Sequence, residues 1–458
     1  MKSVALHNLG CKVNAYEMDV MQQMLQEKGY KIVPFDTDAD IYIINTCTVT
    51  NIADRKSRQM LHRAKKRNPQ AVVVAVGCYV QTGRKALEAD GCIDLAIGNN
   101  RKKDLIPILE EFLKERETGC PDKTMQETTV LDLSGPVPYE EMTLERTAEH
   151  TRAYIKIQDG CNQFCSYCII PFARGRVRSR RADDIMREAQ GLVLAGYQEI
   201  VITGIHISSY GMDFVKETKG DYLGDVREET YRQGHLLRLI ERLHGIEGLK
   251  RIRLGSLEPR IITREFAKAL RALPKVCPHF HLSLQSGCDA TLARMNRHYL
   301  AGEYYEKVQL LRQVYENPAI TTDVIVGFPG ESQEEFAQTR AFLEKVGFYE
   351  MHVFRYSKRQ GTNAAKMPEQ VPDAVKAQRS DILLSLEREQ SAAYRSMFLG
   401  REIEILFEEA VSADGKTYMT GHTKEYVKAA FETEENLSNQ ILTKKAVGFL
   451  NETTVLVQ

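Results

Sequence analysis

The stretch GCNQFCSYC holds three cysteines in C-x3-C-x2-C spacing, Cys161, Cys165 and Cys168, here called the loop triad. Three thiols within eight residues indicate a metal centre rather than core packing. A structural zinc ion needs four ligands, and no histidine or cysteine follows in the next thirty residues, which disfavours a local zinc site. An iron–sulfur cubane with one iron free of protein ligands fits three thiols better. A small molecule could then chelate the free iron.

A second set of cysteines is scattered in the sequence but placed alike. Cys11 follows the apolar run SVALHNLG, Cys47 follows DIYIINT and Cys78 follows AVVVAVG; these three are called the sheet triad. Because ligands of open α/β sheets collect outside the carboxyl ends of the strands, cysteines at three such ends can converge on one point. This placement predicts a second site with three protein ligands. The other cysteines are interpreted as packing residues: Cys92, Cys120, Cys277 and Cys288.

The elements around these cysteines predict a chain of the α/β class with three structural units. Residues 1–115 alternate buried strand patterns with helical patterns, as in an open parallel sheet. Residues 149–390 contain six strand candidates, each followed by a helical pattern, which predicts a partial (β/α)6 barrel. Residues 401–458 change to short alternating runs that are typical of a small all-β domain, and the bounds of this unit are set at 391–458. Residues 116–148 lose this periodicity and are expected to form a linker.

Small and polar residues follow the predicted barrel strands. The carboxyl ends of such strands form the face on which barrel proteins carry their chemistry. Each of these residues alone would fit a helix cap or a turn glycine equally well, but together they form a candidate cofactor cradle. His206 and His281 are expected to pack or cap rather than to bind a ligand. The cradle candidates are Gly204, Ser256, Glu258, Ser283, Gln285, Gly327 and Glu331.

The residues of several motifs also resemble those of known families. GCNQFCSYC, with Tyr167 before the third cysteine, resembles the cluster-binding loop of the radical-SAM superfamily. LGCKVNAYE, INTCTVTNIADRKSRQ and VGCYVQ look like its methylthiotransferase branch, and TGHTKEYVKAAF is similar to the TRAM module. Within the branch, LGCKVN and NTCTVTN look most like the enzymes that act on threonylcarbamoyladenosine in tRNA, beside the anticodon.

The resemblance implies a tRNA-modifying enzyme whose chemistry is carried by cofactors, so no side chain is expected to be catalytic itself. It implies two [4Fe-4S] clusters, one on each triad. S-adenosylmethionine would bind the open iron at the loop triad, with contacts from Tyr167 and the cradle candidates, and would yield a 5′-deoxyadenosyl radical. The cluster on the sheet triad would hold the sulfur that is delivered to C2 of the adenine. The expected partners are tRNA, a low-potential electron donor protein and a sulfur source.

A basic run, ARGRVRSRR, comes directly after the loop triad and contains no acidic residue. Charge runs are usually solvated, but five arginines beside a radical site fit phosphate contacts. A second basic stretch, residues 55–67, is a weaker candidate for the same role, and the RNA role of the slightly acidic last unit comes from the resemblance alone. The predicted RNA-binding residues are Arg174, Arg176, Arg178, Arg180 and Arg181.

The composition is that of a soluble globular protein. The chain has 458 residues, 43% hydrophobic residues and a formal net charge of zero, so RNA would be held by local patches. No signal peptide and no membrane span are recognised, and no membrane partner is expected. Ten cysteines without an export signal argue against a disulfide framework. These features predict a cytoplasmic protein.

Two alternatives to the threonylcarbamoyladenosine enzyme stay open at this point. A methylthiotransferase could act on another tRNA adenosine or on a ribosomal-protein aspartate by the same mechanism. A chain of a different class, a non-catalytic zinc-dependent RNA-binding protein, would also carry cysteine sets and basic runs. The metal content separates these classes, since the enzyme requires iron and sulfide and the binding protein only zinc.

Overall fold

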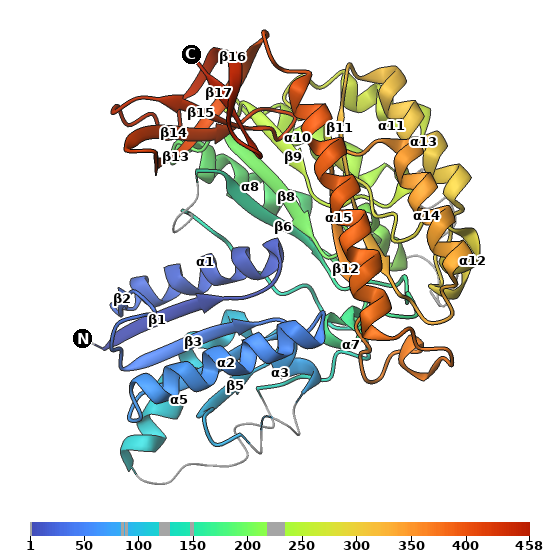
Figure 1. Ribbon diagram of the computed structural model, residues 1–458. Helices are drawn as coiled ribbons and strands as arrows, with labels where there is room; N and C mark the ends of the chain where they lie inside the picture. Colours follow the sequence, from blue (N-terminus) through green and yellow to red (C-terminus); the bar gives the residue numbers. More distant parts are fainter. Residues whose placement is uncertain (1, 84–86, 88–89, 119–128, 147–150, 218–233) are drawn as a thin grey trace.

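The computed structural model describes residues 2–458 except 84–86, 88–89, 119–128, 147–150 and 218–233. Figure 1 shows the N-terminal sheet at the lower left, the large central unit at the right and the C-terminal strands at the upper left. Within the described residues, no helix is both long enough and apolar enough to cross a membrane.

The N-terminal unit is an open parallel sheet with strand order β2-β1-β3-β4-β5, as predicted. Its central strands β3 and β4 are buried throughout because helices cover both faces. Helices α1 and α5 pack on the face toward the central unit, and α2 and α3 pack on the other face. The elements are β1 Ser3–Asn8, α1 Lys12–Glu27, β2 Lys31–Val33, β3 Ile41–Thr46, α2 Asn51–Arg67, β4 Val72–Gly77, α3 Cys78–Thr82, β5 Leu95–Ile97, η1 Lys102–Asp104 and α5 Leu105–Thr118.

The central unit contains the six predicted parallel strands, which confirms the partial barrel. One sheet has the order β7-β6-β8-β9 and another has the order β10-β11-β12. Parallel bridges from Ile252 to Val276 and from Leu257 to Leu282 continue the curve from the first sheet to the second. The short β7 pairs antiparallel with β6 at the edge. The strands are β6 Ala153–Asp159, β7 Arg178–Ser179, β8 Glu199–Gly204, β9 Arg251–Leu254, β10 His279–His281, β11 Ala319–Val326 and β12 Glu350–Arg355.

Helices cover the outside of this partial barrel, as Figure 1 shows for α11, α13, α14 and α15. Their apolar residues join those of the strands in one continuous core. The helical elements are α7 Ile170–Arg174, α8 Ala182–Leu194, η2 Ile207–Ser209, η3 Met212–Glu217, α10 His235–His244, η4 Pro259–Ile261, α11 Arg264–Arg271, α12 Asp289–Arg294, α13 Ala301–Val314, α14 Gln333–Val346, η5 Ala364–Lys366 and α15 Asp373–Ser396.

The C-terminal unit is a small closed barrel with strand order β13-β14-β15-β17-β16, in agreement with the predicted all-β domain. All its strand pairs are antiparallel except β15 with β17. Its core includes Ala319 and Tyr349 of the central unit, so the two barrels share a packed contact. The strands are β13 Glu402–Ala413, β14 Lys416–His422, β15 Lys428–Glu432, β16 Ile441–Asn451 and β17 Thr454–Val457.

A buried ion cluster joins the N-terminal unit to the central barrel. Lys102, Lys156 and Arg174 all donate hydrogen bonds to the carboxylate of Glu17 on α1. The Glu17 side chain is 1% exposed and each cation is 1% exposed or less. Arg174 also pairs with Asp159 at the end of β6, at 3.1 Å. Removal of one member would leave buried charge without a partner, so we expect the cluster to favour this arrangement of the two units.

Candidate functional site

The loop triad lies at the carboxyl end of β6, where the chain turns into α7. Gly160 starts this turn with a φ of +69°, and a Cβ at this position would lie 1.9 Å from the carbonyl oxygen of Arg176. Only glycine fits there. The Cys161 N–H donates to the Gly175 carbonyl at 3.0 Å, which ties the two ends of the loop together. The three sulfurs are therefore held on a short, anchored loop.

Burial disfavours the thiolate forms of Cys161 and Cys168 as long as no cation is bound. Burial, with the neighbouring Cys165, raises the pKa of Cys161 to about 12 and also raises the pKa of Cys168. Arg297 Nη1 donates to Cys165 Sγ at 3.2 Å and supplies positive charge beside the loop. Metal binding would displace the thiol protons.

The sheet triad collects at the carboxyl ends of three adjacent strands, as the sequence predicts. Cys11 caps the start of α1 after β1, Cys47 follows β3, and Cys78 starts α3 after β4. Gly10 has a φ of +104°, and a Cβ there would lie 2.9 Å from the Cys47 Cβ, so this glycine permits the first two cysteines to approach each other. Burial raises the pKa of Cys47 to about 11, and Cys78 and Cys11 add to this shift. Cys11 keeps an exposed surface.

Both triads are suited to clusters rather than to single ions. Within the described residues, neither triad brings three ligand atoms within 4.8 Å of one another, alone or with a neighbouring His, Asp or Glu. Thiolates that bind separate irons of a cubane lie further apart than the ligands of one ion. The donor sets therefore fit a [4Fe-4S] cluster at each triad, with one iron left to other ligands.

One asparagine and one arginine connect the two triads. The Asn99 side-chain amide donates to Cys78 Sγ at 3.5 Å and to the Ala173 carbonyl of α7 at 2.7 Å. Arg174, the next residue of α7, interacts electrostatically with Cys78 and Cys11. Helix α7 begins two residues after the last cysteine of the loop triad. Both triads therefore flank the same junction between the N-terminal and central units.

The cradle candidates follow the carboxyl ends of the barrel strands. Gly204 ends β8, and a Cβ there would lie 3.0 Å from the Gln158 carbonyl oxygen. Gln285 has a φ of +74°, and its N–H donates to the Asp323 carbonyl at 2.9 Å, which fixes the backbone after β10. The Ser283 carbonyl accepts from the Tyr299 hydroxyl at 2.6 Å. These contacts form a rigid backbone rim; the ligand contacts of its residues stay a prediction.

The acidic cradle candidates are already engaged by arginines. Glu258 accepts a hydrogen bond from Arg260 Nε at 2.8 Å. Glu331 accepts from Arg379 Nη1 at 2.6 Å, and also from the Gly327 N–H at 2.6 Å. Such contacts brace the loops that follow β9 and β11. Of the remaining candidates, Ser256 is exposed, and the ring of Tyr167 packs edge-on against Phe328 at 6.4 Å.

The structure corrects the predicted RNA contacts of Arg174, Arg178 and Arg180. These side chains are 5% exposed or less and lie in ion pairs, with Glu17 and Asp159 for Arg174, Asp159 for Arg178 and Glu188 for Arg180. Buried arginines of this kind cannot reach a phosphate. Arg176 is half-buried and Arg181 is exposed, so RNA contacts of these two residues stay a prediction. Counting charges in the sequence could not separate the two kinds of arginine.

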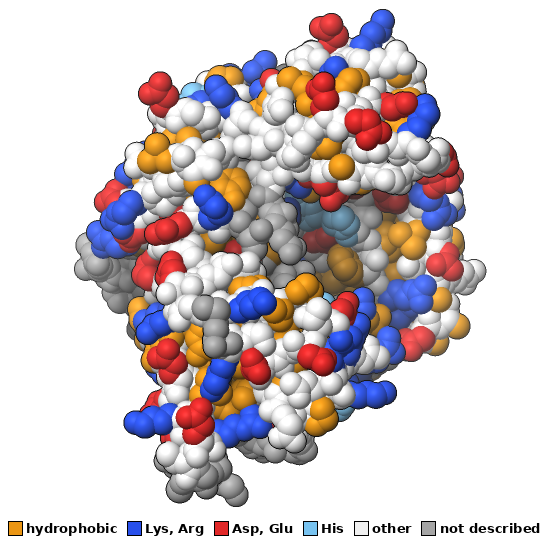
Figure 2. Space-filling view, turned by 90° about the vertical axis from the view of Figure 1, so that its left-hand side faces the viewer, with side chains coloured by type: hydrophobic (Ala, Val, Ile, Leu, Met, Phe, Trp, Pro, Cys, Tyr) orange, Lys and Arg blue, Asp and Glu red, His pale blue; other side chains and the backbone are white. Residues whose placement is uncertain are grey.

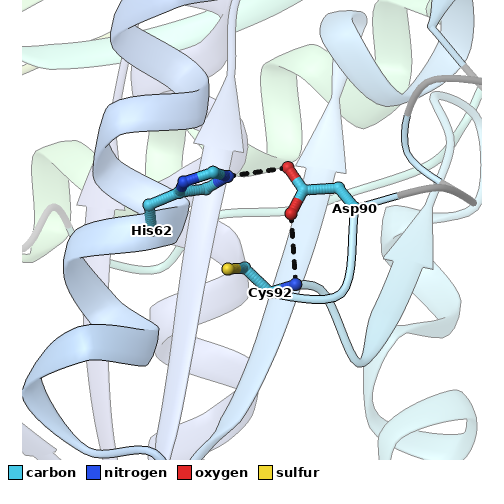
Figure 3. A group of neighbouring side chains, drawn as sticks. All are labelled: His62, Asp90 and Cys92. Atoms are coloured by element: carbon cyan, nitrogen blue, oxygen red, sulfur yellow. Dashed lines mark hydrogen bonds and ion pairs between the residues drawn. The ribbon is translucent and has the colours of Figure 1, made fainter.

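Two further groups of described residues each bring three potential ligand atoms within 4.8 Å of one another. Figure 3 shows the first, His62, Asp90 and Cys92, with His62 Nε2 2.8 Å from Asp90 Oδ2. Cys92 is therefore half-buried beside polar groups, in contrast to the packing role expected for it. The second group consists of His281, Asp323 and His352 on adjacent strands of the central barrel.

The other histidine and cysteine predictions have mixed outcomes. His206 occupies the N-cap position of η2 but makes no side-chain capping hydrogen bond; its Nδ1 instead lies 2.6 Å from the Ser209 hydroxyl, and burial lowers its pKa to about 4. His281 instead pairs with Asp323, with 3.3 Å between Nε2 and Oδ2. Cys277 and Cys288 are buried in the core, which confirms their packing role. Cys120 lies outside the described residues.

Comparisons with known proteins agree with this geometry. Residues 3–98 match the family described as uncharacterized protein family UPF0004, and residues 155–343 match the radical SAM superfamily. A solved structure of TsrM, a radical S-adenosylmethionine methyltransferase from Kitasatospora setae, shares the fold with a TM-score of 0.53 and 15% identity, over 77% of this chain and 72% of that chain.

Curated relatives align over nearly the full length. The threonylcarbamoyladenosine tRNA methylthiotransferase MtaB of Bacillus subtilis is 38% identical over 97% of this chain and 94% of its own. MtaB of Aquifex aeolicus is 38% identical over 88% of this chain and 92% of its own. The tRNA-2-methylthio-N(6)-dimethylallyladenosine synthase of Moorella thermoacetica is 32% identical over 96% of this chain and 95% of its own. The chain therefore belongs to the methylthiotransferase family of radical-SAM enzymes, which use S-adenosylmethionine and [4Fe-4S] clusters.

Proposed function

We propose that this enzyme adds a methylthio group to C2 of threonylcarbamoyladenosine, next to the anticodon of tRNA. The observation that carries the proposal is the junction of the two triads, where Asn99 bonds both Cys78 and the carbonyl of Ala173 on α7. An adenine that enters this junction can face a radical-generating site and a sulfur-holding site together. Loss of either triad should therefore abolish the product.

The reaction itself requires cofactor chemistry. The C2 hydrogen of adenine is neither acidic nor hydridic, so acid–base side chains cannot replace it. S-adenosylmethionine and the two clusters, when bound, would supply the radical that removes this hydrogen and the sulfur that replaces it. The side chains of this chain bind and orient these groups and the base. We also propose that the electron comes from a low-potential donor protein and that a separate sulfur source serves the sheet triad.

The choice of substrate rests on the relatives. Relatives named as threonylcarbamoyladenosine enzymes are 34–38% identical to this chain, and those named as dimethylallyladenosine enzymes are 32% identical. Both names specify a tRNA, which favours tRNA over a ribosomal-protein aspartate. A tRNA substrate also supports a cytoplasmic location for the enzyme.

Contacts with RNA are proposed at the rim of the loop triad. The Arg176 guanidinium carbon lies 4.4 Å from the ring centroid of Phe164, inside the triad loop. Phe164 and Phe172 are exposed, at 37% and 54%. An arginine stacked on an exposed aromatic ring is suited to splayed bases and to phosphates, and the second exposed ring belongs to α7 in the same segment of the chain. The two rings and Arg176 thus form a candidate platform for the anticodon loop.

Mass spectrometry of tRNA nucleosides tests the proposal. A deletion strain should lack methylthiolated threonylcarbamoyladenosine and should accumulate the unmethylthiolated nucleoside, while any methylthiolated dimethylallyladenosine is unchanged. The gene should restore the product, and so should the Cys92→Ala variant, because Cys92 belongs to neither triad. The Cys47→Ala variant should not restore it. A deletion strain with normal methylthiolated threonylcarbamoyladenosine would refute the proposed substrate.

A further inference from the structure

Basic side chains from two structural units meet an aromatic ring from the third. The electrostatic neighbours of the Lys12 ammonium are Tyr426, Arg152, Arg253 and Glu199. Lys12 is the first residue of α1, directly after Cys11. Arg152 precedes β6 and Arg253 lies in β9, whereas Tyr426 belongs to the C-terminal barrel. Figure 2 shows that the molecule is hollowed between its units and that histidine side chains lie on the inner wall.

Tyr426 is the centre of this group. The guanidinium carbons of Arg152 and Arg253 lie 5.0 and 4.8 Å from its ring centroid. The ring of His279 lies 5.1 Å away. Tyr426 has a φ of +72°, which bulky residues rarely adopt. Strained backbone of this kind is concentrated at functional positions. The ring is therefore held in place by contacts from the central unit and by a constrained turn.

The two arginines are neutralised, but the lysine is not. Arg253 Nε donates to Glu199 Oε1 at 2.7 Å, and Arg152 Nε lies 3.2 Å from Glu408 Oε1. Among the described residues, the Lys12 ammonium forms no hydrogen bond or ion pair, and the side chain is exposed. Lys12 therefore contributes a positive charge that these contacts leave uncompensated.

Beside Tyr426, a buried histidine has a ring nitrogen without a hydrogen-bond partner. His279 is 6% exposed, and its Nδ1 has no hydrogen-bond partner. Burial, together with the nearby Arg253 and Lys12, holds the pKa of His279 well below its usual range, so the imidazole is neutral. An orphaned buried nitrogen costs free energy unless a ligand satisfies it. An uncompensated cation and an orphaned polar atom together describe a site for an anion.

We infer that Lys12, His279 and Tyr426 form a subsite for a carboxylate carried on the substrate base. The inference rests on the proposed function, because the threonylcarbamoyl group ends in a carboxylate. Lys12 would supply the charge, and the imidazole and the phenol would supply directed hydrogen bonds.

The position of Lys12 favours a carboxylate on the base over a backbone phosphate. Cys11 belongs to the sheet triad, which handles sulfur in the proposed reaction, and Lys12 is the next residue. C2 and the N6 substituent belong to the same adenine ring, so a base with C2 toward the triad brings its substituent into the same hollow. A neutral, apolar substituent would leave the lysine charge unpaired, which selects against it.

Binding by the reconstituted holoenzyme tests the subsite. Two anticodon stem-loop RNAs are compared, one with threonylcarbamoyladenosine and one in which its carboxylate is converted to a carboxamide. The wild-type enzyme should bind the acid about tenfold or more tightly than the amide, as expected for a charge-assisted contact. The affinities of the Lys12→Met variant for the two RNAs should lie within about twofold of each other. The Lys12→Arg variant should retain the preference for the acid. Lys31→Met, a change at an exposed lysine of β2, should behave as the wild type.

Iron content is measured for each variant, so that damage to the neighbouring cluster is recognised. The comparison of acid and amide RNA with the wild-type enzyme does not depend on any variant. Equal affinity of the wild type for acid and amide would overturn the inference. So would a Lys12→Met enzyme that loses affinity for both RNAs equally, since Lys12 would then contact a phosphate. A wild type that prefers the acid but yields no methylthiolated product would support the subsite and refute the proposed reaction.

Discussion

The buried carboxylate of Glu17 offers the sharpest test of how the two triads are held together. Glu17→Gln keeps the shape of the side chain but leaves three buried cations, Lys102, Lys156 and Arg174, with fewer counter-charges. Removal of one member of a buried ion pair typically costs about 3–5 kcal/mol. With an m-value of about 4 kcal/mol/M for a unit of this size, the urea midpoint should fall by about 1 M.

The pH dependence of this effect has a defined sign. Burial opposes ionisation of Glu17, but Arg174, Lys102 and Lys156 outweigh burial and hold the pKa of this carboxyl well below its usual range. A depressed folded-state pKa contributes stability that is present above the unfolded pKa and is lost as the pH falls through the folded value. The difference in the free energy of unfolding between the wild type and Glu17→Gln should therefore be fully present at pH 7 and pH 5. This difference should become smaller only in stronger acid.

Urea unfolding followed by circular dichroism, under anaerobic conditions and at both pH values, measures the effect. Glu110→Gln is the matched control, because Glu110 is half-exposed and lies 3.9 Å from Lys28, a pair that contributes less than about 1 kcal/mol. If Glu17→Gln shifts the midpoint no more than the control, the ion cluster does not hold the two units and the reasoning fails.

Four further predictions concern the two triads and the arginines that follow the loop triad. Changing the whole loop triad to Ala should remove about half of the iron and leave the other cluster, and complete loss of iron from a folded variant would show that the clusters depend on each other. Cys47→Ala should still form 5′-deoxyadenosine with a strong reductant but no methylthiolated RNA, whereas normal product would contradict a sulfur role for the sheet triad. Arg176→Glu should weaken tRNA binding and flatten its salt dependence by about one unit of slope. Arg178→Glu should instead destabilise the fold, because this side chain is buried beside Asp159.

The fold was predictable because its signals are local and repeated. The buried runs that become β3 and β4, and the six strand–helix repeats of the central unit, follow from hydrophobic periodicity. The convergence of Cys11, Cys47 and Cys78 follows from the topology of a parallel sheet, in which neighbouring strands end at one edge. Their role as cluster ligands stays a prediction of the family.

Other parts of the site depend on contacts between distant segments, which no local pattern records. Arg297 reaches Cys165 from more than a hundred residues away, and its approach to the loop depends on the barrel curve. Tyr426 meets Arg152 and Arg253 only because the C-terminal barrel docks on the central one. Lys12 stood in a recognised motif, but its role could not be separated from that of a solvated lysine until its neighbours were known.

The arginine run after the loop triad shows how one sequence feature serves two physical purposes. Arg174 neutralises Glu17 and Asp159 across the junction, and Arg180 neutralises Glu188, so these charges act inside the molecule. Arg176, between them, turns outward onto Phe164. Because the same short segment links the loop triad, the ion cluster and the exposed ring, we expect docking of the N-terminal unit to affect the proposed RNA contact at Arg176 and Phe164. A change that loosens the ion cluster should therefore weaken RNA binding even though it touches no RNA.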